Sequence, residues 1–357
     1  MQKLIFIDTE CYKNYFLVLV KNEEGKVHYW EMFNDKRPDT IMLAKALKSK
    51  TRTFVSFNGL SYDMPMVEAF LNGFTNEQLK ALSDDIIVNQ ARKYHNLPCD
   101  HIDIINIPIG QSSLKIYAGR LHCKKMQDLP IEPSATIKES DISNLRQYCE
   151  NDVDNTRLIF YKVRKQIELR EDMTEQYGIN LNSKSDAQIA EAIIKSEMQK
   201  TYNIPINKFK AKNYADNHIF KYTDPKIIKF KSHELNLIFN RLLKEEFKLA
   251  ENGSIICPDW LGERITIGTT VYQMGIGGIH SCEKAQHIKN DNDYHLCEQD
   301  VTGFYPNIIM QQGLYPESIG VNFLELYKSI VTRRTLAKKR SLEIEKELKK
   351  LKLQLEL

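Results

Sequence analysis

The stretch LIFIDTE at residues 4–10 decides the fold of the first part of this chain. It is a run of β-forming residues that ends on two carboxylates, Asp8 and Glu10. Because side chains alternate between the two faces of a strand, both carboxylates point the same way and can share one metal site. Alone, this pattern also fits the solvated end of an ordinary strand. Two further acidic motifs, NGLSYD at residues 58–63 and YCEND at residues 148–152, favour the metal site.

The composition is that of a globular protein. With 357 residues, of which 42% are hydrophobic, the chain is long enough for two or three domains. The net charge is +3, and the basic part is the tail, because residues 325–357 carry ten Lys and Arg against five Glu. Seven cysteines, an odd number with no Cys-x-x-Cys pair, indicate reduced thiols in a cytoplasmic protein. No window approaches the roughly 18 apolar residues of a membrane helix, so we expect no membrane partner.

Hydrophobic periodicity and turn residues predict the elements that carry these motifs. We expect strands at residues 3–8, 15–20, 26–31, 53–57 and 101–104, and helices at residues 39–50, 75–95 and 140–177. The last of these helices places Tyr148 and Asp152 one turn apart on one face. A short basic helix at residues 112–121 fits a contact with a backbone phosphate and a solvated turn equally well.

The sequence pattern changes from helical to strand-forming in the second half. Strands are predicted at residues 255–257, 264–267, 270–273 and 295–300. We therefore expect a domain boundary near residues 250–260. Residues 323–357 form one long charged helix in this interpretation, because no glycine or proline interrupts them.

Four carboxylates from three distant parts of the chain suggest one chemistry. Hard oxygen ligands in this number suit Mg²⁺ or Mn²⁺ rather than zinc. Two such ions about 3.5–4 Å apart catalyse in-line attack on a phosphodiester. We expect Asp8 to bridge the ions, and the Tyr148 hydroxyl, with an ordinary pKa near 10, to orient the attacking water.

The three motifs, in this order and spacing, resemble the proofreading 3′→5′ exonuclease of DNA polymerases, in the type with four acids and a tyrosine in the third motif. The resemblance implies a ribonuclease-H-like fold, two metal ions, and Asn58 and Tyr62 next to the frayed 3′ end of DNA. The catalytic and metal-binding residues that it implies are Asp8, Glu10, Asp63, Tyr148 and Asp152.

Motifs in the second half resemble family B DNA polymerases. QDVTGFYPNII at residues 299–309 is similar to the first palm motif, which implies a metal ligand at Asp300 and exclusion of a ribose 2′-hydroxyl by Tyr305. YQMGIGGIHS at residues 272–281 resembles the segment that links exonuclease and palm. It implies contacts of Gly277 and Gly278 with primer-template DNA, although a glycine-rich hairpin turn has the same sequence pattern.

The terminal helix resembles the start of the fingers of the same family. This implies that Arg334 and Lys338 approach the incoming nucleotide, and a solvated charged helix is an equally good interpretation. Its leucines predict a partner, either the remaining fingers or another copy of the helix. The later fingers and palm motifs of the family do not occur in these 357 residues, so we do not expect the chain alone to polymerise DNA. The first motif begins so early that the organisation resembles viral enzymes of phages, which would place the protein in the host cytoplasm.

These patterns define one expectation for the whole chain. It is an α/β protein with a ribonuclease-H-like exonuclease domain at residues 1–185 and a helical connecting region at 186–255. A partial α+β palm follows at 256–322, with the start of a fingers helix at 323–357. The expected function is that of the N-terminal portion of a family B DNA polymerase, with an exonuclease for single-stranded or frayed DNA. Two alternatives stay open: the DNA-binding or assembly half of a split polymerase that needs a partner chain, and an RNA 3′-exonuclease.

Overall fold

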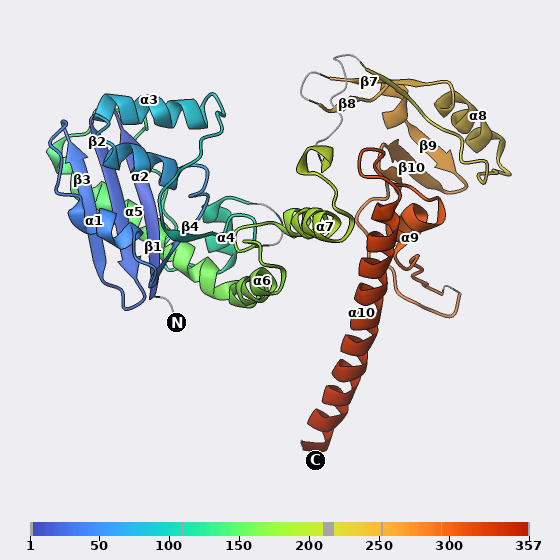
Figure 1. Ribbon diagram of the computed structural model, residues 1–357. Coiled ribbons are helices and arrows are strands. Elements are labelled where there is room, and N and C mark those ends of the chain that lie inside the picture. Colours follow the sequence, from blue (N-terminus) through green and yellow to red (C-terminus); the bar gives the residue numbers. More distant parts are fainter. Residues whose placement is uncertain are drawn as a thin grey trace. The chain divides into compact units, whose positions relative to one another are not determined.

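The chain forms two compact units, Met1–Asn203 and Ile204–Leu357 (Figure 1). The computed structural model describes residues 3–108, 110, 112–209, 218–250, 253–293 and 295–355. The described hydrophobic residues that are buried lie almost entirely in the first unit, with only Trp260 and Leu261 in the second. The first unit also contains all three acidic motifs.

A five-stranded mixed sheet forms the centre of the first unit, in the order β3-β2-β1-β4-β5. The strands β1, β2 and β3 form an antiparallel meander, and β4 and β5 run parallel to β1. All five strands predicted for this part of the chain are present, with ends that differ by a few residues. Their bounds are β1 (Lys3–Tyr12), β2 (Tyr15–Asn22), β3 (Val27–Phe33), β4 (Arg52–Ser56) and β5 (Asp100–Asp103).

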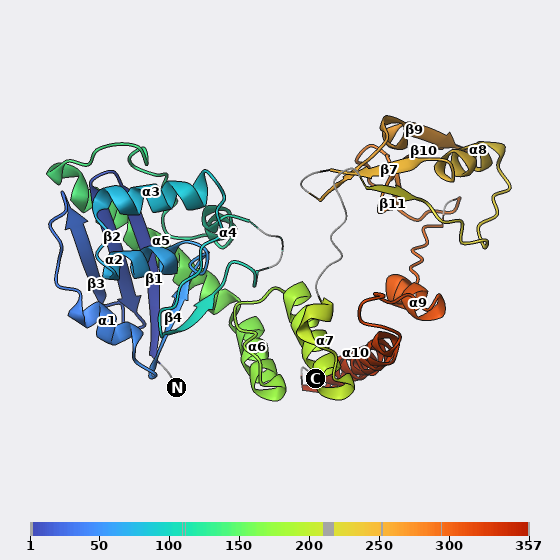
Figure 2. The ribbon, with the colours of Figure 1, turned by 45° about the horizontal axis from the view of Figure 1, so that its top comes forward.

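Helices cover both faces of this sheet (Figures 1 and 2). One face packs against α1 (Ile41–Leu47), α2 (Asp63–Leu71) and α3 (Asn76–Ile87), and the other against α4 (Leu114–Arg120) and α5 (Ile142–Lys162). The alternation along β1 explains the two cores, because Ile7 belongs to the first and its neighbour Phe6 to the second. The first unit is therefore a three-layer α/β structure.

Three helices are shorter than predicted, and the first of them, expected over residues 39–50, is α1 (Ile41–Leu47). The single helix expected over residues 140–177 is two helices, α5 and α6 (Arg164–Tyr177), separated at Val163, whose φ of −99° and ψ of 17° leave the helical region. Val163 is buried in the core that α5 also contacts, so the break keeps it against the sheet. The helix expected over 75–95 ends with α3 at Ile87, and Gln90 has a left-handed φ of 55° that stops it.

Helix α7 (Asp186–Tyr202) closes the first unit, and the second unit is built on two small sheets. One sheet has the order β6-β7-β8 and the other β11-β10-β9. Residues 186–255 were expected to be helical, and this prediction is wrong in part, because they include the strands β6 and β7 as well as α7 and α8. These two strands are only three and four residues long, too short for a periodic signal. The strand predicted at 255–257 is present as β8. The bounds are β6 (Ile219–Lys221), α8 (His233–Leu242), β7 (Glu246–Leu249), β8 (Ile255–Ile256), β9 (Arg264–Ile267), β10 (Thr270–Gly275) and β11 (Gly278–Ser281).

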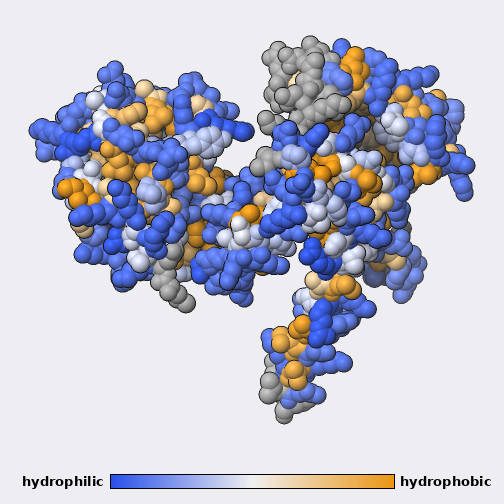
Figure 3. All heavy atoms as spheres, in the orientation of Figure 1, coloured by the Kyte–Doolittle hydropathy of each residue, from blue (hydrophilic) through white to orange (hydrophobic). Residues whose placement is uncertain are grey.

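The last described segment contains α9 (Phe304–Gln311) and the 34-residue helix α10 (Asn322–Leu355), which confirms the predicted terminal helix. Apolar side chains are exposed along α10, including Leu336, Leu342 and Leu348, and appear as orange spheres between blue ones (Figure 3). The strand predicted at 295–300 is not formed by the described residues there, which are exposed. No helix in the described ranges is long and apolar enough to span a membrane.

Candidate active site

Asp8 and Glu10 lie within β1, on the face that packs against α5. Asp8 and Glu10 are an even number of positions from Phe6 and Tyr12, so their side chains point to the same face of the strand. Phe6 and Tyr12 both belong to the core on that face. Strand β4 accompanies β1 only as far as the pair Phe6↔Val55 and ends one residue later. The two carboxylates therefore lie beside the end of β4, although the backbone around them is still paired with β2.

The chain leaves β4 in a tight loop that begins with Asn58, whose φ is 70°. The carboxylate of Asp103 holds this loop, since its two oxygens accept hydrogen bonds from the backbone N–H groups of Asn58 (2.8 Å) and Leu60 (2.9 Å). Asp103 lies at the end of β5, which runs parallel to β4, so the carboxyl ends of both strands meet at this loop. This role of Asp103 was not among the predictions from the sequence. The available signal was an acid at the end of the strand that follows the motif.

Asp63 begins α2 and is fixed to β1 from the opposite face. Its side chain is buried, and Oδ1 accepts a 2.6 Å hydrogen bond from the hydroxyl of Thr9, the residue between Asp8 and Glu10. A Cβ atom on Gly59 would lie 2.1 Å from Ser56 Oγ and 3.2 Å from Asp63 Oδ2. The motif therefore requires glycine at position 59, because the loop passes directly against the Ser56 side chain.

Helix α5 supplies the third set of groups. Tyr148 and Asp152 share its inner face, as predicted, and Tyr148 is close enough to Asp152 and Glu10 for their charges to affect its hydroxyl. The thiol of Cys149 donates a weak hydrogen bond to Asp8 Oδ2 at 3.6 Å, a contact that the sequence analysis did not predict. Ligand atoms of Asp8, Glu10 and Cys149 lie within 4.8 Å of one another, so these three residues form a group that can hold a metal ion.

Burial and mutual repulsion dominate the electrostatics of the site. Burial raises the pKa of Asp8 and of Glu10 well above the ordinary value, and the charges of Asp63 and Asp152 raise both further. Burial also raises the pKa of Asp63 to about 7, although the Thr9 hydroxyl opposes the shift. Oδ1 of Asp152 is buried without a hydrogen-bond partner among the described residues. A cation therefore fits the site, because it satisfies this oxygen and offsets the repulsion.

The Tyr148 hydroxyl differs from the expectation of an ordinary pKa. Burial raises its pKa, and the neighbouring charges of Asp152 and Glu10 raise it further, because a phenolate there would add a negative charge to the carboxylates. The hydroxyl is therefore protonated at neutral pH. In this state it can donate one hydrogen bond and accept another.

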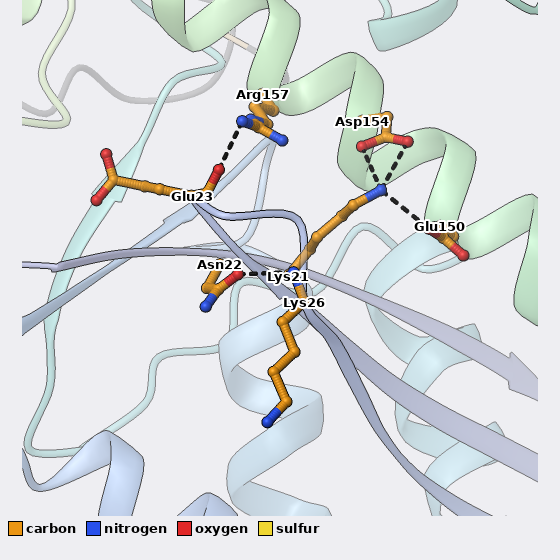
Figure 4. Close-up of polar contacts among 7 residues, drawn as sticks. All are labelled: Lys21, Asn22, Glu23, Lys26, Glu150, Asp154 and Arg157. Atoms are coloured by element: carbon orange, nitrogen blue, oxygen red, sulfur yellow. Dashed lines mark hydrogen bonds and ion pairs between the residues drawn. The ribbon is translucent and has the colours of Figure 1, made fainter.

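Ion pairs hold α5 in place against the sheet (Figure 4). Lys21 on β2 is buried, and its Nζ contacts Glu150 Oε1 at 2.9 Å and Asp154 Oδ1 at 2.8 Å, on either side of Asp152 in the sequence. Arg157 donates a 2.7 Å hydrogen bond to the carbonyl oxygen of Glu23. These contacts fix the helix that carries Asp152 relative to the strand pair that carries Asp8.

The two residues predicted to contact DNA in the first unit lie on the same loop. Asn58 is exposed, whereas Tyr62 is half-buried and its hydroxyl hydrogen-bonds to Ser83 Oγ at 2.8 Å. The Tyr62 hydroxyl thus points to α3, and its ring lines a neighbouring groove together with Asn58.

The polymerase-side residues lie in the second unit and are exposed. They are Gly277, Gly278, Asp300, Tyr305, Arg334 and Lys338. Within the described ranges, Asp300 belongs to no group of three potential metal ligands. The roles given to these residues stay predictions.

The mixed sheet and the buried acidic group define an α/β protein with a candidate metal site. The chain belongs to a family described as predicted 3′-5′ exonucleases related to the exonuclease domain of PolB, whose family model matches residues 6–211, more than half of the sequence. No curated protein matches it.

One solved structure with similarity is the family B DNA polymerase from the hyperthermophilic archaeon Pyrobaculum calidifontis. The identity is 16% and the TM-score 0.40, over 61% of this chain and 32% of the polymerase chain. The matched part thus spans about a third of the length of that polymerase.

Proposed function

We propose that the chain hydrolyses DNA from the 3′ end with two Mg²⁺ or Mn²⁺ ions as cofactors. The observation that carries this proposal is that Asp63 and Asp152, from two other segments of the chain, lie close enough to Asp8 and Glu10 for their charges to raise the pKa of both. Asp8, Glu10, Asp63 and Asp152 would hold the ions, with Asp8 between them. When bound, the ions supply positive charge to the attacking and leaving oxygens of an in-line displacement at phosphorus.

The residues of the chain position the reactants. The protonated Tyr148 hydroxyl lies next to Asp152 and can orient a water molecule by accepting one hydrogen bond and donating another. Thr9 and the Asp103-bound loop hold Asp63 against β1, and ligand atoms of Asp8, Glu10 and Cys149 already lie within 4.8 Å of one another. Such preorganised groups stabilise charge more effectively than water does.

A groove beside the second motif supports a single-stranded or frayed substrate. It has a volume of about 960 Å³ and is lined by Asn58 and Tyr62 of the motif, and by Arg92 and Tyr94 of the loop that follows α3. Tyr94 is 81% exposed, so a base can stack on its ring, and Arg92 can contact a backbone phosphate. Stacking and charge contacts of this kind do not distinguish base sequences.

The test is the digestion of a 5′-labelled single-stranded DNA oligonucleotide by the whole chain. We expect a ladder that shortens from the 3′ end with Mg²⁺, no ladder with EDTA, and no ladder with the Asp8→Ala or Asp152→Ala variant. Asp172→Asn serves as the control, because Asp172 is exposed on α6. Equal activity of all variants would overturn the assignment, and faster digestion of the matching RNA oligonucleotide would favour the RNA exonuclease.

We further propose that residues 1–185 form a ribonuclease-H-like exonuclease domain, and that 256–322 and 323–357 begin a family B palm and fingers. The motif resemblance supports this proposal, in which Asp300 binds a metal ion, Tyr305 excludes ribose, and Arg334 and Lys338 face the nucleotide. Its test is primer-template binding by the whole chain. Substitution of Gly277 and Gly278 by Asp should weaken binding to primer-template but leave the cleavage of short single strands unchanged.

A second candidate function rests on α10. Its exposed leucines and basic residues favour an assembly role, in which the chain acts as half of a split polymerase. A folded chain that lacks exonuclease activity alone and gains it with a chain that carries the remaining palm would support this candidate. Full activity of the isolated monomer would exclude a requirement for such a partner.

A further inference from the structure

A buried tyrosine lies two residues beyond Glu10 on the same face of β1. Tyr12 is 1% exposed and belongs to the core between the sheet and α5. Its ring lies near the equally buried ring of Tyr15, with the centroids 6.5 Å apart. Because residues two apart in a strand share a face, packing fixes the Tyr12 ring on the side of the carboxylates.

The hydroxyl of Tyr12 interacts with the Glu10 carboxylate. Burial raises the pKa of Glu10, and the Tyr12 hydroxyl opposes this shift as a hydrogen-bond donor does. Burial also raises the pKa of Tyr12, and the charge of Glu10 raises it further. The hydroxyl is therefore protonated at neutral pH and can donate to Glu10.

This hydroxyl nevertheless lacks a well-formed hydrogen bond. It is buried, and no partner among the described residues meets it with hydrogen-bond geometry. The neighbouring Tyr15 differs, because its hydroxyl donates a 2.5 Å bond to Glu31. Folded proteins rarely keep a buried hydroxyl without a partner, since it lowers stability. The stability of the fold therefore does not explain the hydroxyl of Tyr12.

Two other carboxylates of the site already have a side-chain donor. Thr9 donates to Asp63, and the Cys149 thiol donates to Asp8. In metal sites, hydrogen bonds from such neighbouring groups orient the carboxylates that bind the ion. Tyr12 is the corresponding donor beside Glu10, and a small movement of the Glu10 carboxylate would align the two groups.

We propose that Tyr12 is a positioning residue, which donates a hydrogen bond to Glu10 when a divalent cation occupies the site. This inference rests on the proposed function. With the cation bound, Glu10 has two partners, the ion and the Tyr12 hydroxyl. The hydroxyl then has the partner that it lacks without the ion, so the hydrogen bond strengthens cation binding.

The experiment compares Mn²⁺ binding and stability of the wild type and Tyr12→Phe. Loss of a hydrogen bond to a metal ligand typically weakens metal affinity by about 10- to 100-fold, and we expect about tenfold in a calorimetric titration at pH 8. In EDTA, the urea denaturation midpoint of Tyr12→Phe should equal or exceed that of the wild type, because the substitution removes a buried hydroxyl without a partner. A purely structural role predicts the reverse, namely a lower midpoint in EDTA and an unchanged Mn²⁺ affinity.

Tyr15→Phe is the matched control, because Tyr15 is buried in the same core but its hydroxyl bonds to Glu31. It should lower the denaturation midpoint in EDTA and leave Mn²⁺ affinity unchanged. Equal Mn²⁺ affinity of Tyr12→Phe and the wild type would overturn the proposal, and so would a lower midpoint of Tyr12→Phe in EDTA. If the wild type binds Mn²⁺ no better than Asp8→Ala, the proposed function fails instead.

Discussion

The carboxylate of Asp103 offers the sharpest test of how the second motif is held. It is 2% exposed and accepts three backbone hydrogen bonds, from Asn58 (2.8 Å), Leu60 (2.9 Å) and Ile105 (3.0 Å). In Asp103→Asn, the amide oxygen can replace Oδ1 and keep the bonds from Asn58 and Ile105. The amide nitrogen then faces the Leu60 N–H, so two donors meet.

The magnitude follows from these bonds. A buried N–H without a partner costs about 1–3 kcal/mol, and two charge-assisted bonds become neutral, which costs roughly 1 kcal/mol each. Burial raises the pKa of Asp103 despite the three bonds, because the buried charge is unfavourable. Removal of this charge in the asparagine variant therefore offsets part of the loss in stability. We therefore expect Asp103→Asn to lower the free energy of unfolding by about 2 kcal/mol. The loop carries Asp63, and the exonuclease rate should fall by about tenfold or more when it shifts.

Urea denaturation followed by circular dichroism measures the stability, with Asp172→Asn as the control. Hydrogen exchange of the Asn58 and Leu60 amides reports directly on the loop, and both amides should exchange faster in the variant. The reasoning would be refuted by an unchanged denaturation midpoint together with unchanged protection of these two amides.

Three further predictions concern the same site. Without divalent metal, the free energy of unfolding should fall as pH rises from about 4 to about 7. The reason is that the pKa of Asp63 is raised from 3.8 to about 7 in the folded protein, so the folded chain keeps a proton that the unfolded chain releases. Thermal unfolding in EDTA tests this prediction. Gly59→Ala should cost about 1–3 kcal/mol and lower kcat, because its Cβ would collide with Ser56. Lys21→Met should cost only about 1–2 kcal/mol in urea denaturation, since its partners Glu150 and Asp154 are 41% and 49% exposed.

Each of these has a control or a contradicting result. Mn²⁺ should stabilise the protein more at pH 8 than at pH 6, because metal binding requires ionised carboxylates, and the opposite order would contradict the assignment of the ligands. Gly262→Ala should be tolerated, because its Cβ would meet nothing closer than 3.8 Å. If Lys21→Met unfolds the chain outright, the ion pairs of α5 contribute more than their exposure indicates.

The sequence predicted the parts of the site that depend on local periodicity. Asp8 and Glu10 share a face because strands alternate, and Tyr148 and Asp152 share one because helices repeat every three to four residues. Asp103 and Cys149 were missed because their roles depend on which strands and helices pack together. The strand order that brings β5 next to β4 is not visible in the residues around Asp103.

Element ends were predicted less well than the elements themselves. The break at Val163 and the end of α3 are set by single backbone conformations, including the left-handed Gln90, and neither position carries glycine or proline. In the second unit, the short strands β6 and β7 give no periodic pattern, and their pairing depends on partners elsewhere in the chain.

The spacing of the acids along the chain has a consequence for how the protein is made. Asp8, Asp63 and Asp152 come from segments that a ribosome releases in succession, and the paired residues of β1 and β4 are 49 positions apart in the sequence. Because such non-local pairs form slowly, the site cannot assemble before α5 has emerged and docked. A chain that ends before α5 would thus lack Tyr148 and Asp152 of the proposed site. Catalytic activity, once measured, would then also report that the first unit has folded.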